Sequence, residues 1–179
     1  MSKHYVHLNL NINPVNIDYS NLKKSYQTKI QLENLNPELI SILHNRGMIV
    51  NYAESFYSPP YFFQQIHTDN LGGDYIKINF VYGGKGSQMN WYRIKEDITP
   101  KKVHFTTKVS TKYIPWETNA VDLIESDLLE YPSIVQVGCP HNVVNRGEYR
   151  LCISVVLCDR NLQRVSMQSA TTNLADIII

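Results

Sequence analysis

The stretch "YIKINFVYGGKGSQMNWYRI", residues 75–94, decides how the fold is read from the sequence. Two runs rich in aliphatic and aromatic residues, 75–82 and 88–94, have the composition and length of β-strands. The glycine-rich segment 83–87 lacks the spacing of a phosphate-binding loop and lies between two strands rather than before a helix. We therefore expect a hairpin turn that joins two neighbouring strands.

Strand patterns continue on both sides of this stretch. Further candidate strands cover residues 4–12, 48–57, 101–109, 133–144, 149–159 and 163–170. Segment 36–47 is the best candidate helix, because Asn36 can act as the N-cap, Pro37 suits the first helical position and Gly47 follows the end. Segment 16–27 reads as a short helix, and segment 116–131 as partly helical. The fold class is therefore mainly β with flanking helices, either a sandwich or a barrel, in one domain over residues 1–179.

Composition excludes several classes of function. The 179 residues carry 17 basic and 16 acidic side chains, a net charge of +1, so no excess of positive charge favours nucleic acid or an anionic membrane. No apolar run is long enough to span a membrane, and the N-terminus lacks the apolar core of a secretory signal. Three cysteines without a C-x-x-C pair suggest neither a disulfide framework nor a zinc knuckle. We expect a soluble, cytoplasmic protein.

The candidate chemistry begins at His67 and Asp69. Residues i and i+2 of an extended chain project to the same side, so this pair can present an imidazole and a carboxylate together. Such a pair often arises by chance, but His141 follows on a distant candidate strand and Arg150 opens the next strand after the turn 145–148. Two imidazoles and one carboxylate form the facial set of ligands that holds Fe(II) with positions left open. A keto acid could fill the open positions, and an arginine is suited to bind its far carboxylate, because the guanidinium group stays charged and can form two hydrogen bonds.

Other histidines and nucleophiles are weaker candidates. His4 and His7 could in principle bind a metal, but no acidic residue is near them in the sequence, so a surface or packing role is expected. No G-x-S-x-G motif is present, and no cysteine lies in a recognisable catalytic context.

These residues resemble a known family. The H-x-D pair, the distal histidine and the arginine nine residues after it are similar to the pattern of the 2-oxoglutarate- and Fe(II)-dependent dioxygenases, near the small phage and bacterial members of the prolyl 4-hydroxylase group. The resemblance covers roughly residues 48–160. It implies a double-stranded β-helix (a jelly roll, cupin-like) with the site at the open end of the barrel. A phage-encoded protein would act in the host cytoplasm.

The resemblance also implies roles for individual residues. His67, Asp69 and His141 would bind Fe(II), and Arg150 would bind the 5-carboxylate of 2-oxoglutarate. The family often has a small hydroxyl residue two positions after the arginine, where this chain has Cys152. Arg150 is preferred to Arg146, because a residue on a strand is held more rigidly than one in a turn.

Three further residues are candidates for the pocket. Asn79, on the strand expected beside the metal strand, is a possible cofactor-binding residue, and Asn90 and Trp91 lie on its expected hairpin partner. Ordinary cross-strand packing would explain all three equally well.

The implied activity is hydroxylation of a C–H bond, with O2 and 2-oxoglutarate as cosubstrates and succinate and CO2 as products. The substrate would be a small molecule or a peptidyl side chain, with prolyl favoured by resemblance alone. Neither nucleic acid nor membrane is an expected partner, and the oligomeric state is open, although the apolar tail 175–179 could pack as a strand or interface. Two alternatives stay open: a non-catalytic jelly-roll or cupin-like binding or structural module, and a cupin-type metalloenzyme without a keto acid.

Overall fold

The structure is a computed structural model, and it describes residues 4–69, 73–98, 105–106 and 112–179. It is mainly β, with two antiparallel sheets and two α-helices, as the sequence predicted at this level of detail. Most of the candidate strand 101–109 lies outside the described residues. Within the described ranges, no helix is long and apolar enough to cross a membrane.

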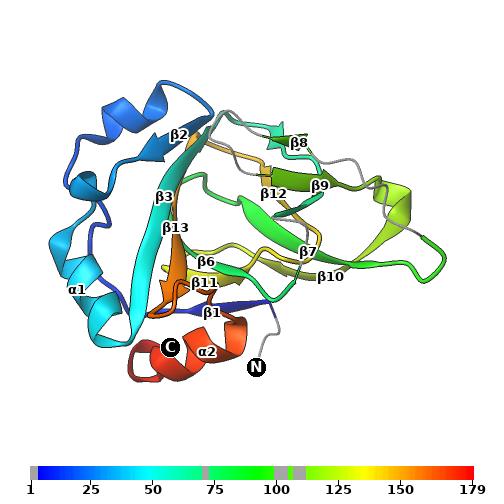
Figure 1. Cartoon of the computed structure of the whole chain (residues 1–179). Coiled ribbons are helices and arrows are strands. Elements are labelled where there is room, and N and C mark those ends of the chain that lie inside the picture. Colours follow the sequence, from blue (N-terminus) through cyan, green and yellow to red (C-terminus); the bar gives the residue numbers. More distant parts are fainter. Residues whose placement is uncertain (1–3, 70–72, 99–104, 107–111) are drawn as a thin grey trace.

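The first sheet has six strands. In spatial order they are β1 (Tyr5–His7), β11 (Ser133–Gln136), β6 (Ile76–Gly83), β13 (Arg150–Asp159), β3 (Met48–Ser58) and β2 (Gln27–Ile30). The long strands β3 and β13 are its centre, and their burial agrees with their apolar sequences. Figure 1 shows β3 and β13 running side by side through the molecule.

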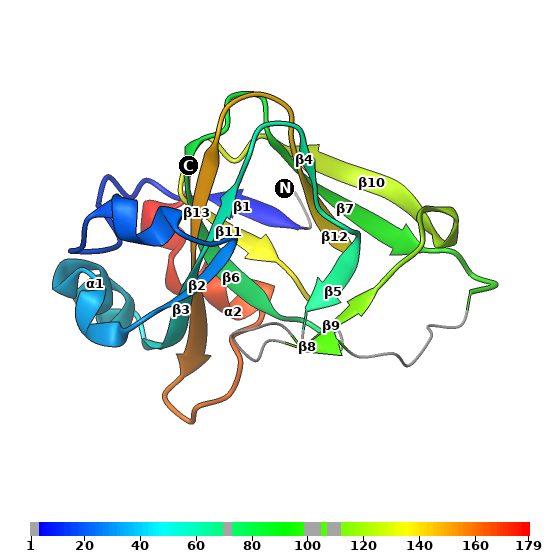
Figure 2. The ribbon, with the colours of Figure 1, turned by 90° about the horizontal axis from the view of Figure 1, so that it is seen from above.

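The second sheet has seven strands and shorter elements. Its path is β10 (Val121–Asp127), β7 (Gln88–Ile94), β12 (His141–Asn145), β5 (His67–Asp69), β9 (Lys112–Pro115) and β8 (Phe105–Thr106), and β4 (Phe62–Phe63) pairs with β12 outside this path. In Figures 1 and 2, β5, β7, β9 and β12 lie on one side of β3 and β13, and α1 (Pro37–Asn45) lies on the other.

The helices differ in how well the sequence predicted them. Helix α1 is confirmed, with the Asn36 side chain accepting a hydrogen bond from the backbone N–H of Glu38. In segment 16–27 the helical part is only a short 3-10 helix, η1 (Tyr19–Lys23). Two further 3-10 helices are η2 (Leu32–Asn34) and η4 (Ala175–Ile177). The expected helical part of 116–131 is limited to η3 (Thr118–Ala120), after which the chain forms strand β10.

The expected strand at 163–170 is wrong. Its second half belongs to helix α2 (Met167–Asn173), and Arg164 makes only an isolated bridge to Cys158. Ser166 caps the helix by accepting a hydrogen bond from the backbone N–H of Ser169, and the buried Ala170 packs into the core. A cap and tertiary packing thus outweigh a weak strand pattern.

The expected hairpin of residues 75–94 is also wrong. Strands β6 and β7 both form, but β6 pairs with β11 and β13 in the first sheet, while β7 pairs with β10 and β12 in the second. The segment 83–87 carries the chain from one sheet to the other. Gly83 and Gly84 have positive φ, and the Gly84 N–H donates to the carbonyl of Tyr149, in the connection from β12 to β13.

Two crossings therefore lie together at one edge of the molecule. The connection 83–87 links β6 to β7, and the connection 146–149 links β12 to β13, each passing between the same two sheets. Their backbones touch: a Cβ on Gly83 would lie 2.5 Å from the Tyr149 carbonyl oxygen, and one on Gly147 would lie 2.5 Å from that of Lys85. Only glycine permits this approach.

The first sheet has two chemically different faces. Residues Ile76, Ile78 and Phe80 of β6 face the helices and join the largest apolar core, which includes Leu39 and Leu43 of α1. The alternate residues Lys77 and Asn79 face the second sheet. Both faces are buried, so this polar face requires partners.

Ile153, at the centre of β13, tests the apolar core. It is fully buried, and Ile153→Ala should lower the free energy of unfolding by about 2–5 kcal/mol, because it removes buried methyl groups and leaves a cavity. Urea unfolding measures this loss. Leu123→Ala, at a 59% exposed position of β10, is the control and should change the stability by less than about 0.5 kcal/mol. Equal effects of the two variants would contradict this placement of the core.

Candidate metal centre and adjoining pocket

His67, Asp69 and His141 meet in the structure. His67 and Asp69 are the ends of β5, and His141 opens β12 as the register partner of His67. One ligand atom from each residue lies within 4.8 Å of the others, and the two imidazole rings are 4.4 Å apart between centroids. The buried Thr68 points the other way, where its hydroxyl accepts a hydrogen bond from Trp116 Nε1 at 2.8 Å.

Backbone carbonyls orient both imidazoles. Nδ1 of His67 lies 2.9 Å from the carbonyl oxygen of Gln65, and Nδ1 of His141 lies 2.9 Å from that of Cys139. A carbonyl only accepts, so Nδ1 carries the proton in the neutral ring and Nε2 keeps its lone pair. Nε2 of His67 is 3.5 Å from Oδ1 of Asp69. Both rings are therefore prepared to donate Nε2 to a metal.

The charges of the cluster are set by burial and by neighbouring groups. Burial would raise the pKa of Asp69, but the Lys77 ammonium group, together with the neighbouring imidazoles of His67 and His141, outweighs it and lowers this pKa to about 2. Burial, reinforced by repulsion from His67, lowers the pKa of His141 to about 3. At neutral pH the cluster thus holds a carboxylate and a neutral His141, the protonation states that a metal requires.

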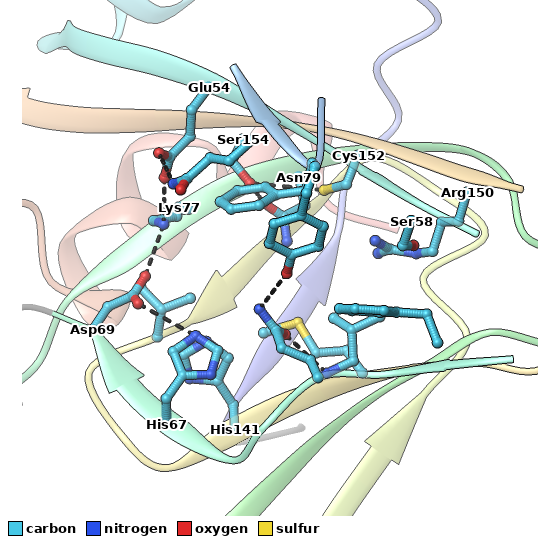
Figure 3. A pocket seen from close by; sticks show the side chains of 18 of the residues that line it. Glu54, Ser58, His67, Asp69, Lys77, Asn79, His141, Arg150, Cys152 and Ser154 are labelled. Carbon is cyan, nitrogen blue, oxygen red and sulfur yellow. Dashed lines mark hydrogen bonds and ion pairs between the residues drawn. The ribbon is translucent and has the colours of Figure 1, made fainter. Parts of the chain in front are cut away.

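A buried ion-pair network extends from Asp69. Lys77 Nζ lies 2.7 Å from Oδ2 of Asp69 and 2.9 Å from Oε1 of Glu54, whose Oε2 accepts a hydrogen bond from Gln27 Nε2. Burial would lower the pKa of Lys77, but the two carboxylates raise it well above its usual value. Lys77 therefore stays charged and holds Oδ2, which leaves Oδ1 toward the imidazoles (Figure 3).

A cavity of about 400 Å³ opens beside this cluster. Figure 3 shows His67, Asp69 and His141 at one end, and Arg150 with Ser58 at the other. Aromatic and apolar side chains supply much of the wall: Tyr26, Phe56, Phe62, Phe63, Met89, Tyr113, Val137 and Val143. The sheets thus enclose a pocket that has three candidate metal ligands at one end and the guanidinium group of Arg150 at the other.

Arg150, and not Arg146, lies in the wall of the cavity. It is the first residue of β13, is only 4% exposed and lines the cavity, whereas Arg146 is exposed in the turn before it. In the described part of the chain no carboxylate forms an ion pair with Arg150, and its Nε has no hydrogen-bond partner. A buried, unpaired guanidinium group costs free energy unless an anion binds it.

The remaining candidates divide. Asn79 lines the cavity, but its Oδ1 already accepts a hydrogen bond from Ser154 Oγ at 2.6 Å. Asn90 and Trp91 are buried outside the cavity lining. Asn90 Nδ2 donates to Asn142 Oδ1, and Trp91 Nε1 donates to the Gln136 carbonyl, so both serve packing. For these two residues the structure agrees with the packing alternative, while Met89 of the same strand lines the cavity.

Glu54, Ser58 and Lys77 were not assigned to the site from the sequence. A signal existed for two of them: Lys77 interrupts the apolar run 75–82, and Glu54 interrupts the run 48–57. A charged residue in the centre of a strand that is buried on both faces needs a buried partner. Ser58 gave no such signal, because serine is common at strand ends and turns.

Replacing Lys77 tests the ion-pair network. Lys77→Met leaves the carboxylates of Asp69 and Glu54 buried without their cation and should lower the free energy of unfolding by about 3–5 kcal/mol. The double variant Lys77→Met/Glu54→Gln should lose less, because one buried charge is removed as well. Urea unfolding compares the variants.

Lys95→Met is the matched control. Lys95 makes a half-exposed pair with Asp122 at 3.7 Å, so this substitution should change the stability by less than about 1 kcal/mol. A loss at Lys77 no larger than that at Lys95 would refute a structural role of the network.

The pKa of His141 predicts how the stability of the metal-free protein depends on pH. The unfolded chain protonates this imidazole near pH 6.5, the folded protein only near pH 3. Between these values the unfolded state binds more protons, so the free energy of unfolding should fall as the pH is lowered through this range. Urea unfolding at several pH values gives the slope. His141→Gln should make it shallower, and an unchanged slope would contradict a buried neutral imidazole.

Comparison with known proteins identifies no family for the chain. No protein-family model matches it, and no curated protein is significantly similar to it in sequence. One similar solved structure is the crystal structure of Peruvianin-I, a cysteine peptidase from Thevetia peruviana latex, with 13% identity over 92% of this chain and 95% of the other. Its TM-score of 0.34 is too low to support any inference about fold or activity.

Proposed function

We propose that the chain is an Fe(II)- and 2-oxoglutarate-dependent dioxygenase, related to the prolyl 4-hydroxylase-like members of that superfamily, and that its two sheets form a jelly roll. The observation that carries the proposal is one cavity with the His67–Asp69–His141 cluster at one end and the unpaired Arg150 at the other. The cluster suits the metal, and Arg150 suits the far carboxylate of the keto acid.

The donor set supports iron as the metal. Two imidazole nitrogens and one carboxylate oxygen on one face are the ligands of non-haem Fe(II) oxygenases. Tetrahedral structural zinc would need a fourth protein ligand, and in the described part of the chain the cluster has three. Three ligands leave open positions for a bidentate keto acid and for O2.

The charge of the pocket supports a dianionic ligand. Lys77 and Arg150 bring two positive charges, and Asp69 and Glu54 bring two negative ones, so the described lining is neutral when both imidazoles are neutral. A divalent cation adds two positive charges, and a keto acid with two carboxylates balances them. Arg150 can pair with the carboxylate that the metal does not bind.

The topology supports the jelly roll. The paired strands β6 and β13 continue through adjacent crossings into the paired strands β7 and β12 of the other sheet. They form an antiparallel ribbon that passes between the sheets, as in a double-stranded β-helix.

With Fe(II) and 2-oxoglutarate bound, the site would use O2 to hydroxylate a C–H bond and release succinate and CO2. The chain contributes binding and orientation: the imidazoles and Asp69 hold the metal, Lys77 holds Asp69, and Arg150 orients the keto acid. The aromatic wall shields the reaction from water and contacts the substrate, a small molecule or a peptidyl side chain such as prolyl.

One observation favours a second candidate, a non-catalytic jelly-roll or cupin-like binding module. Lys77 Nζ lies 2.7 Å from Oδ2 of Asp69, and a fixed cation beside the cluster weakens its attraction for a divalent metal. Such a module would bind an anion at Arg150 without a metal. A cupin-type enzyme without a keto acid leaves Arg150 without a role.

Anaerobic titration of the apoprotein with Fe(II) and 2-oxoglutarate tests the proposal. The expected result is a visible metal-to-ligand charge-transfer band that appears only when both are present. His67→Ala should abolish the band through loss of the metal, and Arg150→Ala should require at least about tenfold more keto acid, because a charge-assisted pair is lost. Arg146→Ala, at an exposed arginine, is the control and should behave as the wild type. Folded wild-type protein without the band would refute the dioxygenase and favour the binding module.

A further inference from the structure

Ser58 lies beside Arg150 at the far end of the cavity. The two residues are register partners on the antiparallel strands β3 and β13, and both line the cavity. Directly opposed residues of such a pair present their side chains on the same face, with Cβ atoms about 5 Å apart. Figure 3 shows the Ser58 side chain next to the guanidinium group.

Both side chains carry a buried polar atom without a partner. Ser58 is 3% exposed and Arg150 4%, and neither Oγ of Ser58 nor Nε of Arg150 has a hydrogen-bond partner in the described part of the chain. Buried polar atoms are nearly always satisfied, so two adjacent exceptions that line one cavity indicate a missing acceptor. A carboxylate can accept from both groups at once.

The two β13 side chains next to Arg150 on this wall, Cys152 and Ser154, cannot replace Ser58. Cys152, in the position where the resembling family often has a hydroxyl residue, has a thiol 3.7 Å from Ser154 Oγ, and a thiol is a weak donor. The Ser154 hydroxyl is committed to Asn79 Oδ1. Of the β3 and β13 side chains at this end, Ser58 therefore offers the uncommitted hydroxyl, from the strand beside β13 instead of from β13 itself.

We infer that Ser58 is a ligand-binding residue, which donates its hydroxyl to the same carboxylate that Arg150 pairs with. Where the resembling family often has a hydroxyl residue two positions after the arginine, this chain has Cys152, and Ser58 supplies the hydroxyl from the neighbouring strand β3. This inference rests on the proposed function, and it makes Ser58 a determinant of specificity for a keto acid that ends in a second carboxylate.

Calorimetric titration of the Zn(II)-loaded protein tests the inference without turnover. Ser58→Ala should raise the Kd for 2-oxoglutarate by about tenfold or more, as expected for a lost hydrogen bond to a charged group. The Kd for 2-oxobutyrate, which lacks the distal carboxylate, should be unchanged. In the double variant Ser58→Ala/Cys152→Ser, the new hydroxyl on β13 should recover part of the affinity, an effect that a merely structural serine would not produce.

Ser55→Ala is the matched control. Ser55 lies on the same strand and its Oγ is also buried without a partner, but it does not line the cavity, so its removal should leave the Kd unchanged. Tyr26→Phe separates the contribution of the other hydroxyl near this end, which accepts a hydrogen bond from Gln64 Nε2.

The outcomes separate this inference from the proposed function. If Arg150→Ala weakens 2-oxoglutarate binding and Ser58→Ala does not, the role of Ser58 is refuted and the dioxygenase proposal stands. If Ser58→Ala weakens 2-oxobutyrate binding equally, Ser58 acts on the structure of the pocket and the inference also fails. If folded, Zn(II)-loaded wild-type protein binds no 2-oxoglutarate, the proposed function and the inference fail together.

Discussion

The ion pairs of Lys77 are the constraint on which the pocket depends. Lys77 belongs to β6 and Glu54 to β3, two strands of the first sheet that are separated by β13. Asp69 belongs to β5 of the second sheet. One ammonium group therefore links the two sheets across their interface. Three charges are stable there only because each has a partner, since an isolated buried charge would cost several kcal/mol. The geometry of Asp69, and hence of the His–Asp–His cluster, follows from this link.

The first sheet carries buried polar residues on one of its two buried faces. Its face toward the helices is apolar and contains the main core, while its face toward the second sheet carries Lys77, Glu54, Arg150 and Ser58. The core against the helices gives the sheet its stability, so the opposite face is free to hold a cavity and unsatisfied polar atoms. This division between a stabilising face and a binding face is typical of proteins that place a site on rigid strands.

The sequence predicted elements better than their pairing. Strands β3, β6, β7 and β13 and helix α1 have strong local patterns and appear where expected, whereas α2 depends on packing that no short window contains. The hairpin error arose because 83–87 has the glycines of a tight turn, and the choice of sheet is made by distant strands. His4 illustrates the same limit: its partner Glu125 lies 121 residues away on β10. That His67, Asp69 and His141 come together, in one cavity with Arg150, could be predicted because a candidate metal site constrains the residue types and their spacing.

His141 and Arg150 lie on opposite sides of the connection 146–149, one in each sheet. A ligand held by the cluster at one end and by Arg150 at the other would span the interface between the sheets and act as a non-covalent cross-link. It would then tie together two halves of the molecule that the 83–87 and 146–149 crossings join at one edge. Because such a ligand would bind only when the two sheets are together, its binding free energy would also oppose their separation.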